Sequence, residues 1–318
     1  DPIKDIKAIW QIYFQLRLDR PWCLHTLTPK AGLVGMFSAW VARVPIRVHT
    51  FTGQVWVTRT GLMRQLLKLA DKCTALMATH VLVDSPSQRD FLITEGVIKA
   101  SKSKVLASGS ICGVNTKRFC SNLQVRNNIR FELDAAEDAL VCLYLGRLTR
   151  DKGVLDLAAA FSIVAALHPK AELWVVGPDE GDYFAEMMSL MNGLENRVKR
   201  VGYTNTPEQY MQAADLFCLP SYREGFGSSV IEAAACGVPA LTSRIYGLTD
   251  AVQEGRTGWM HKAGDIQDLA QVWDKALSSP NELRLRGESA QRNAARMFSE
   301  QVVTDAMLEF YENRCAGL

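Results

Sequence analysis

Two carboxylates flank a glycine-rich turn in the segment REGFGSSVIEAAACGVP, residues 223–239. Glu224 precedes the turn and Glu232 follows it, while Gly225 and Gly227 allow the backbone to come close to a ligand. Two acids at such a turn can accept hydrogen bonds from hydroxyl groups on either side of it. The alternative interpretation is a surface acid followed by an acid that stabilises a helix dipole.

The residues after the turn are expected to start a helix. Gly227, Ser228 and Ser229 would place free N–H groups and the positive end of the helix dipole at the turn. Such a helix start favours an anion, as in many phosphate sites. The segment therefore offers a carboxylate, a phosphate cradle and a second carboxylate in that order. A nucleotide sugar presents its groups in a matching order: sugar hydroxyls, a diphosphate and a ribose diol.

A basic turn stands earlier in the chain, in YLGRLTRDKG, residues 144–153. Arg147 and Lys152 follow an apolar strand, and open α/β sheets bind ligands at the carboxyl ends of their strands. Two cations there can hold a diphosphate, although a solvated basic turn explains the same pattern. The acids of VVGPDEGD, residues 175–182, are interpreted as a solvated loop rather than as a metal site.

Short apolar runs alternate with helical patterns from Ala139 onward, which predicts a parallel sheet covered on both faces. The expected strands are ALVCLYLG, AELWVVG, RVKRVG, DLFCLPS, VPALTS and TGWMH, and the expected helices cover 156–167, 183–191, 207–213, 229–236 and two or three segments in 265–314. The first half alternates in the same way, with strands PWCLHT, PIRVHTF, HVLVDS and SKVLAS and helices at 3–18, 32–43, 62–78 and 87–95.

The fold class that follows is α/β, with two Rossmann-like doubly wound domains. The expected domains are residues 1–116, 117–298 and a C-terminal helix at 299–318 that packs back on the first domain. Because the chain opens on a helix rather than on a central strand, we expect the first domain to be N-terminally incomplete.

Composition excludes several classes of protein. The 318 residues are 48% hydrophobic and 22% charged, and no apolar run is long enough for a membrane-spanning helix. The eight cysteines form no C-x-x-C pair. With a net charge of +2 and no nucleic-acid-binding motif, binding to nucleic acid is not expected. Residues 1–116 nevertheless carry 15 basic and 7 acidic residues, which favours an anionic partner for this half.

The motif E-G-F-G-x-x-x-x-E, followed by A-x-G-x-P, resembles the retaining glycosyltransferases of family 4, which have the two-domain GT-B fold. G-R-L-x-x-x-K-G and the E-G-x-T-G at 254–258 match the same family. The resemblance covers essentially the whole chain and is most specific in residues 144–264. HTLTPKAG and HTFTGQVW look like the bacterial members that build capsule, O-antigen and other lipid-linked glycans.

The resemblance implies roles residue by residue. Arg147 and Lys152 match the pair that holds the donor phosphates. Glu224 matches the acid that binds hydroxyls of the donor sugar, and Glu232 matches the acid that binds the ribose. The donor-binding backbone would be Phe226, Gly227, Ser228, Ser229 and Val230. The resemblance implies transfer of a sugar from a nucleotide sugar, in this family most often a UDP-sugar, with retention of configuration. It also implies that no metal or other cofactor is needed, and the sequence accordingly contains no D-x-D motif.

One position departs from the family pattern. Many relatives carry H-x-x-H at the end of a strand in the first domain, whereas here His49 is followed by Thr52. Thr52 cannot act as an acid or base near neutral pH. Glu224 and His49 are therefore the catalytic candidates. For the acid or base, His25, another group, or a departing phosphate that takes the acceptor proton remain alternatives to His49.

The partners implied are a nucleotide-sugar donor and a glycan or polyprenyl-diphosphate-linked acceptor, in a cytoplasmic protein at the inner face of the membrane. Tryptophans 10, 22, 40 and 56 and the apolar face of the helix at 32–43 are interpreted either as packing against the sheet or as docking on an anionic membrane. Two other functions remain open: a non-catalytic sugar-nucleotide-binding subunit or inactive remnant, and a nucleotide-sugar epimerase on the same fold.

Overall fold

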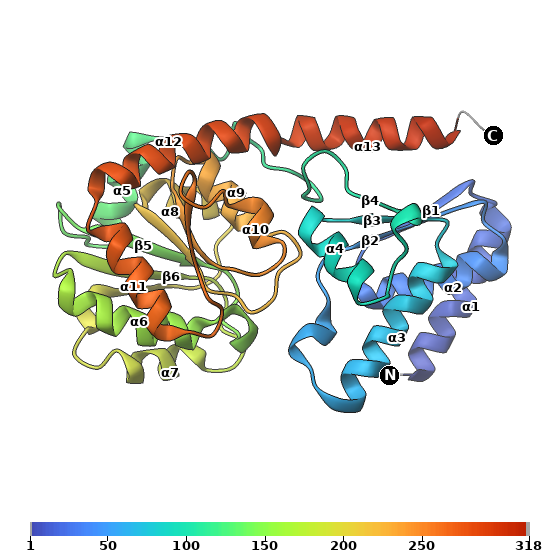
Figure 1. Ribbon diagram of the computed structural model, residues 1–318, viewed down its shortest axis with the longest axis horizontal. Coiled ribbons are helices and arrows are strands. Elements are labelled where there is room, and N and C mark those ends of the chain that lie inside the picture. Colours follow the sequence, from blue (N-terminus) through green and yellow to red (C-terminus); the bar gives the residue numbers. More distant parts are fainter. Residues whose placement is uncertain (1, 316–318) are drawn as a thin grey trace. The chain divides into compact units, whose positions relative to one another are not determined.

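The computed structural model describes residues 2–315 and divides the chain into two compact units. Unit 1 contains the residues up to Ile111, the short segment Glu224–Phe226 and the residues from Val303 onward. Unit 2 contains Cys112–Arg223 and Gly227–Val302. Each unit is built on its own parallel sheet, which confirms the predicted α/β class with two Rossmann-like halves (Figure 1).

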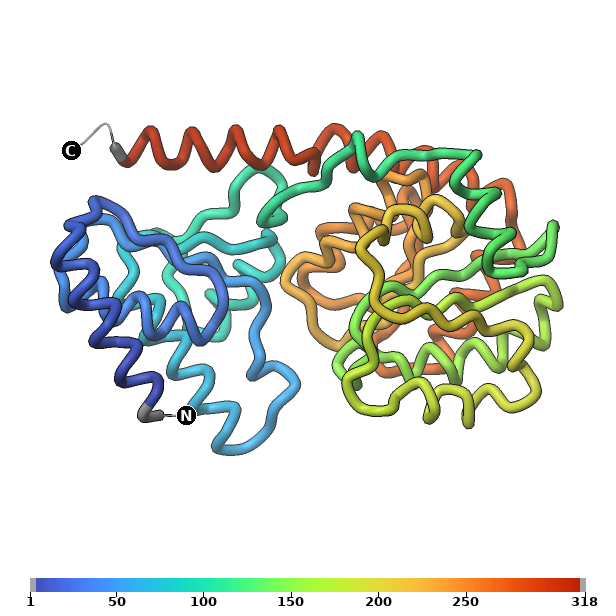
Figure 2. Tube along the Cα trace, turned by 180° about the vertical axis from the view of Figure 1, so that it is seen from behind, coloured from blue at the N-terminus to red at the C-terminus, as the bar shows by residue number. Residues whose placement is uncertain are grey.

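Unit 1 holds a four-stranded sheet in the order β1-β2-β3-β4. The strands are β1 (Cys23–Thr26), β2 (Ile46–Phe51), β3 (His80–Val83) and β4 (Ser103–Lys104), and the helices are α1 (Pro2–Asp19), α2 (Pro29–Ala42), α3 (Gly61–Met77) and α4 (Pro86–Thr94), with 3₁₀ turns at Val55–Thr58 and Ala100–Lys102. All strand pairs are parallel, and α1 lies beside α2 in both views of the chain (Figures 1 and 2).

Both faces of this first sheet are covered, because successive apolar residues of a strand point to opposite sides. On one face, Phe51, Val81 and Val83 pack with Met36 of α2 and with residues of α3 and α4. On the other face, Val48 belongs to a cluster with Phe310 of α13. Helix α13 spans Glu300–Cys315, and its residues from Val303 onward belong to unit 1.

Unit 2 holds a six-stranded parallel sheet in the order β10-β9-β8-β5-β6-β7. The strands are β5 (Leu140–Leu145), β6 (Ala171–Val176), β7 (Val198–Val201), β8 (Leu216–Leu219), β9 (Ala240–Ser243) and β10 (Gly258–His261). The helices are α5 (Leu123–Glu132), α6 (Val154–Leu167), α7 (Tyr183–Leu190), α8 (Pro207–Ala213), α9 (Ser228–Ala235), α10 (Leu248–Ala251), α11 (Ile266–Leu277) and α12 (Pro280–Met297), with 3₁₀ turns at Arg150–Lys152 and Glu195–Arg197.

Helices cover both faces of this second sheet. Figure 1 shows α6, α7 and α11 on one face and α5, α8 and α9 on the other. The strands are continuous apolar runs because both faces are buried; every residue of β6 and β8 is buried, and Trp174 of β6 is fully enclosed. This arrangement fixes the strand ends from which the candidate site is built.

The structure differs from the sequence-based expectation at several elements: strand β4 is shorter than expected, and helices α5 and α10 are absent from the expected set. The run SKVLAS forms a strand of only two residues, Ser103–Lys104, because only Val81 and Leu82 of β3 pair with it. Helix α5 is mostly polar, and only Ile129 of it is buried, so its sequence gives little apolar signal for a helix.

Ion pairs replace apolar packing in helix α5. Arg126 and Arg130 of this helix each pair with the Asp215 carboxylate, at 2.6 Å in both cases. Asp215 also accepts a hydrogen bond from the Val141 N–H at 2.7 Å. Arg130 also donates to the Ala139 carbonyl just before β5 at 3.0 Å, so the helix is attached to the start of this strand both directly and through a carboxylate that lies far away in the sequence.

The histidines of unit 1 contribute to its packing. His25 of β1 is hydrogen-bonded to Tyr311 of α13 through Nδ1, and its Nε2 lies 2.7 Å from the Thr50 hydroxyl. Burial lowers the pKa of His25, so the neutral imidazole is favoured. His80 packs edge-to-face on Phe310 of the same helix. These contacts make His25 a structural side chain that joins β1 to α13.

Candidate functional site

The strand order of unit 2 reverses at β5, which has β6 on one side and β8 on the other. In doubly wound sheets the crevice outside the carboxyl ends of the strands at such a reversal is the usual ligand site. Three of the loops at this edge form the candidate site: those after β5, β6 and β8. They contain Arg147, Lys152 and several of the residues that the sequence assigns to the donor.

The loop after β5 is fastened to the loop after β6. The N–H of Leu148 donates to the Pro178 carbonyl at 2.8 Å, and the Tyr144 hydroxyl donates to the Arg147 carbonyl at 2.7 Å. The Arg147 guanidinium lies on the surface, where its Nη1 contacts both carboxylate oxygens of Glu180 at 3.0 and 3.1 Å. The sequence pattern contains no signal for this ion pair, which joins the basic turn to the acidic loop at 175–182.

The acid beside Glu180 has a local structural role. Burial by itself would raise the pKa of Asp179, but hydrogen bonds from the N–H groups of Phe184, Tyr183 and Gly181 outweigh it and lower the pKa. The carboxylate therefore stabilises the start of α7. Among residues 2–315, no group of three or more His, Cys, Asp or Glu side chains is arranged to hold a metal ion.

Lys152 lies in the 3₁₀ turn Arg150–Lys152, and both of its neighbours contact the loop after β8. Gly153 has φ +68° and approaches Pro220 so closely that a Cβ would lie 2.0 Å from the Pro220 carbonyl oxygen. The carbonyl of Asp151 accepts a hydrogen bond from the Tyr222 N–H at 2.9 Å. The turn that carries Lys152 is therefore packed directly against the end of β8, as a site built from both loops requires.

Helix α9 starts within one residue of the predicted position. Gly227, with φ +82°, precedes the first helical residue Ser228 and supplies no side-chain cap. The first N–H groups of the helix are thus available to a ligand or to water. Val230 closes the first turn with a hydrogen bond to the Gly227 carbonyl at 2.9 Å. The helix start lies at the carboxyl edge of the sheet, and its role as a phosphate cradle stays a prediction.

Glu232 lies in the second turn of α9 and is partly buried. Burial raises its pKa, Arg118 opposes that rise, and Glu208 adds to it. Arg118 and Glu208 form an ion pair at 2.8 Å. Sequence reasoning missed Arg118, because this arginine is separated from Glu232 by more than a hundred residues and belongs to no motif.

Glu224 and Phe226 belong to the short segment that groups with unit 1, although the chain connects them directly to Arg223 and Gly227 of unit 2. Glu224 is partly exposed and Phe226 is buried. No local pattern in the sequence indicates this grouping. The assignment of Glu224 to the donor sugar stays a prediction.

His49, the catalytic candidate of unit 1, is almost completely buried, with 1% of its surface exposed. Its Nδ1 is 2.8 Å from the Thr26 hydroxyl, and its ring packs edge-to-face on Phe51. Burial, followed by the proximity of His25, lowers the pKa of His49 to about 4. A neutral imidazole with this pKa is a weak base, so the environment favours a packing role over proton transfer.

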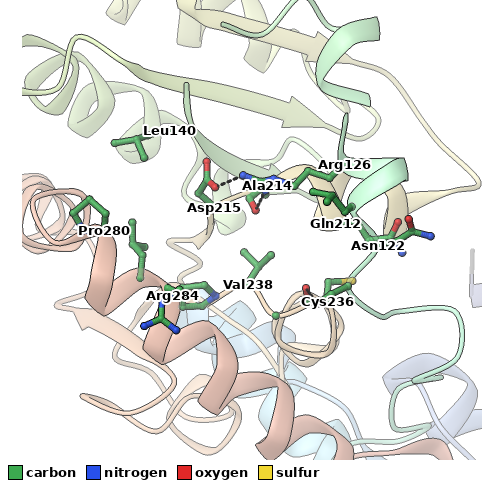
Figure 3. Close-up of a pocket in the computed structure, with 15 residues that line it drawn as sticks. Asn122, Arg126, Leu140, Gln212, Ala214, Asp215, Cys236, Val238, Pro280 and Arg284 are labelled. Atoms are coloured by element: carbon green, nitrogen blue, oxygen red, sulfur yellow. Dashed lines mark hydrogen bonds and ion pairs between the residues drawn. The ribbon is translucent and has the colours of Figure 1, made fainter. Parts of the chain in front are cut away.

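A cavity of about 380 Å³ lies at the opposite, amino edge of the second sheet. Figure 3 shows Leu140, Ala214, Asp215 and Val238 around it, near the starts of β5, β8 and β9 (Figure 3). None of the predicted site residues lines this cavity. The candidate site is therefore the open carboxyl edge and not this hollow.

The structure also reveals contacts that no motif predicts. The Tyr222 hydroxyl is 2.5 Å from a carboxylate oxygen of Asp156. In the E-G-x-T-G segment, both carboxylate oxygens of Glu254 accept hydrogen bonds from Arg244 at 2.7 Å. No helix within residues 2–315 combines the length and apolar character needed to cross a membrane.

Comparison with known proteins agrees with this architecture. The capsular polysaccharide biosynthesis glycosyltransferase CapM of Staphylococcus aureus is 28% identical over 310 residues, covering 96% of this chain and 80% of that protein. The UDP-Gal:alpha-D-GlcNAc-diphosphoundecaprenol alpha-1,3-galactosyltransferase of Escherichia coli is 26% identical over 272 residues, covering 84% and 69%. Anabaena HepE, solved in complex with UDP, superposes with a TM-score of 0.81 at 22% identity, covering 96% of this chain and 82% of that one.

The family model "Glycosyl transferases group 1" matches residues 125–294, which is more than half of the chain and includes the three loops and helix α9. The chain belongs to the group 1 glycosyl transferases and has the two-domain GT-B fold.

Proposed function

We propose that this chain is a retaining, metal-independent glycosyltransferase of family 4 that transfers a sugar from a UDP-sugar to a polyprenyl-diphosphate-linked or glycan acceptor in bacterial surface polysaccharide synthesis. The observation that carries the proposal is the carboxyl edge of unit 2, where the Lys152 turn, the start of α9 and Glu232 follow one another around the strand reversal. The activities of the Staphylococcus aureus and Escherichia coli relatives support the substrate classes.

The donor diphosphate would bind to Lys152, Arg147 and the first N–H groups of α9. A lysine acts there as a point charge, and an arginine can bind two phosphate oxygens at once. Arg147 must exchange its Glu180 partner for phosphate, which costs little because both side chains are exposed, by 58% and 43%. The backbone from Phe226 to Val230 would surround the phosphates.

The two glutamates would bind the two diol-bearing rings. Glu232 would accept hydrogen bonds from the ribose hydroxyls, and Glu224 from the hydroxyls of the donor sugar. A carboxylate that accepts from hydroxyl groups makes charge-assisted bonds, which are stronger than neutral ones. Loss of either side chain should therefore weaken donor binding, and loss of Glu224 should act mainly on transfer.

The leaving UDP would be stabilised by these fixed positive groups instead of by a metal ion. The acceptor hydroxyl would lose its proton to the departing phosphate oxygen, on the same face of the sugar as the new bond. This route suits a chain in which Thr52 occupies the second position of the histidine pair and His49 is buried with a pKa of about 4.

An anionic membrane surface is the proposed environment of the acceptor. Four apolar side chains of α1, spaced four residues apart and therefore on one face, are exposed: Ile6 by 57%, Trp10 by 56%, Phe14 by 64% and Leu18 by 78%. The rings of two of them stack at 6.0 Å. The same helix carries three exposed basic residues: Lys4, Lys7 and Arg17. Apolar and basic groups together are typical of helices that bind an anionic interface.

Helix α2 extends the apolar surface only in part. Phe37, Trp40 and Val41 are exposed, by 39%, 54% and 44%, whereas Met36 is fully buried against the sheet. Trp56 is also buried, and its Nε1 donates to Asp71 at 2.8 Å. The expected apolar face of α2 is therefore divided: one side packs against the sheet, and the other is exposed.

Co-sedimentation with vesicles tests the membrane contact. The full chain should bind vesicles that contain phosphatidylglycerol more strongly than vesicles of phosphatidylcholine alone. Trp10→Ser combined with Phe14→Ser should remove most of this difference, while Leu167→Ser, at an exposed leucine of unit 2, serves as the matched control. Equal binding to both vesicle types would contradict the proposal.

Turnover of labelled UDP-sugars tests the reaction itself. With a polyprenyl-diphosphate-linked glycan as acceptor and with EDTA present, label should pass to the lipid fraction with retained anomeric configuration. Glu224→Ala should abolish transfer while circular dichroism stays unchanged. Donor binding without transfer would favour a non-catalytic binding subunit, and conversion of the donor without acceptor would favour an epimerase.

A further inference from the structure

Tyr222 connects segments of the candidate donor site by three separate contacts. Its hydroxyl donates to Asp156 at 2.5 Å, and its backbone N–H donates to the Asp151 carbonyl at 2.9 Å. Its ring packs on Gly264, where a Cβ would lie 3.2 Å from the ring. All four residues belong to unit 2, and Tyr222 itself directly follows Ser221 in the loop after β8.

The two acids that Tyr222 contacts lie on either side of Lys152. Asp151 immediately precedes the lysine in the 3₁₀ turn, and Asp156 is in the first turn of α6, three residues after Gly153. A contact at both places restrains the turn and the helix start that follows it. The side chain of Lys152 therefore leaves a segment whose position relative to the β8 loop depends on Tyr222.

The hydroxyl bond is retained across the physiological pH range. Burial, and then the hydrogen bond to Asp156, raises the pKa of Tyr222 to about 12. The phenol thus stays protonated and can donate to the carboxylate. A phenylalanine would keep the ring contact with Gly264 and the backbone contact with Asp151, and would remove only the hydroxyl bond.

We propose that Tyr222 is a positioning residue for the donor diphosphate, because its bond to Asp156 holds the turn of Lys152 against the loop that leads into α9. This inference rests on the proposed function. It predicts that the hydroxyl of Tyr222 acts on phosphate binding through Lys152, without touching the nucleotide itself.

The test is a double-mutant cycle read by calorimetric titration with UDP. Tyr222→Phe should weaken UDP binding by about 2- to 10-fold, the range expected for the loss of one hydrogen bond. In the Lys152→Ala background the same change should have no further effect, because the group that it positions is gone. Binding of uridine, which has no phosphate, should not change. Tyr203→Phe is the matched control, since Tyr203 is 74% exposed in the same unit.

Three results would overturn the inference: unchanged UDP affinity in Tyr222→Phe, effects of the two substitutions that add fully, or an equal loss of uridine binding. Asp156→Asn should retain an acceptor and lose less affinity than Asp156→Ala. Melting temperatures of all variants show whether a loss reflects unfolding. If the unmodified chain binds neither UDP nor a UDP-sugar, the proposed function fails with it, whereas failure of Tyr222 alone leaves UDP binding intact.

Discussion

Replacing Gly153 by alanine should damage the candidate donor site for a reason that the structure makes quantitative. Gly153 has φ +68°, a conformation that costs an L-residue about 1–2 kcal/mol. The new Cβ would also lie 2.0 Å from the Pro220 carbonyl oxygen, whereas real Cβ contacts are almost never under 3.0 Å. The Lys152 turn must then move away from the end of β8 by about 1 Å, because the packed interior does not compress.

The two costs of this substitution add. Overpacking of this kind destabilises by about 1–3 kcal/mol, so the total loss should be about 2–5 kcal/mol. For a unit of this size, each kcal/mol lowers the melting temperature by roughly 2–4 °C. Because a displacement of about 1 Å in a binding group can cost as much as 100-fold in function, UDP affinity should also fall sharply.

Gly193→Ala supplies the control for backbone strain. Gly193 has φ +83°, but nothing lies within 4 Å of the Cβ position. Calorimetric melting and UDP titration of both variants separate strain from steric overlap. Gly153→Ala should melt below Gly193→Ala, and only Gly153→Ala should lose UDP affinity. Equal melting temperatures, or unchanged UDP binding in Gly153→Ala, would refute the reasoning.

Three further predictions concern groups with specific partners. The pKa of His49 is lowered from 6.5 to about 4, so the stability present above pH 6.5 should fall as the pH drops toward 4, by at most about 3 kcal/mol. In urea unfolding across this range, His49→Asn should therefore show a flatter pH dependence of stability than the unmodified chain. Parallel pH profiles of the two proteins would contradict this prediction. Glu180→Gln should free Arg147 and tighten UDP binding in titrations. The gain should be no more than about 5-fold, since exposed ion pairs contribute at most about 1 kcal/mol. Weaker UDP binding in this variant would show instead that Glu180 orients the Arg147 guanidinium. Glu232→Gln should weaken UDP binding by about 10- to 100-fold. If the carboxylate binds the ribose hydroxyls, the same substitution should have little effect on the affinity for 2′,3′-dideoxy-UDP, which lacks them. Equal losses of affinity for both ligands would assign Glu232 another role.

Much of the second half could be predicted from its sequence, because buried parallel strands are continuous apolar runs and helix starts have local signals. ALVCLYLG coincides with β5, and the glycine and serines after Phe226 mark the start of α9. The three site loops follow from strand order, since parallel strands end at one edge of a sheet. The family motifs then place candidate roles on these loops.

The remaining features depend on contacts between distant residues. Helix α5 is held by two arginines through Asp215, and its own sequence is mostly polar. The pairing of Arg147 with Glu180 and the bond from Tyr222 to Asp156 arise only when the loops meet. No local pattern encodes such pairs, so they require the structure.

Calorimetric titration with UDP in the presence of EDTA tests the central claim most directly. The full chain should bind UDP with the same affinity with and without magnesium, and Lys152→Ala should weaken that binding strongly, because a charged phosphate contact is lost. GDP and ADP should bind more weakly. Absence of UDP binding in a folded sample, or unchanged binding in Lys152→Ala, would contradict a nucleotide-sugar site at the carboxyl edge of unit 2.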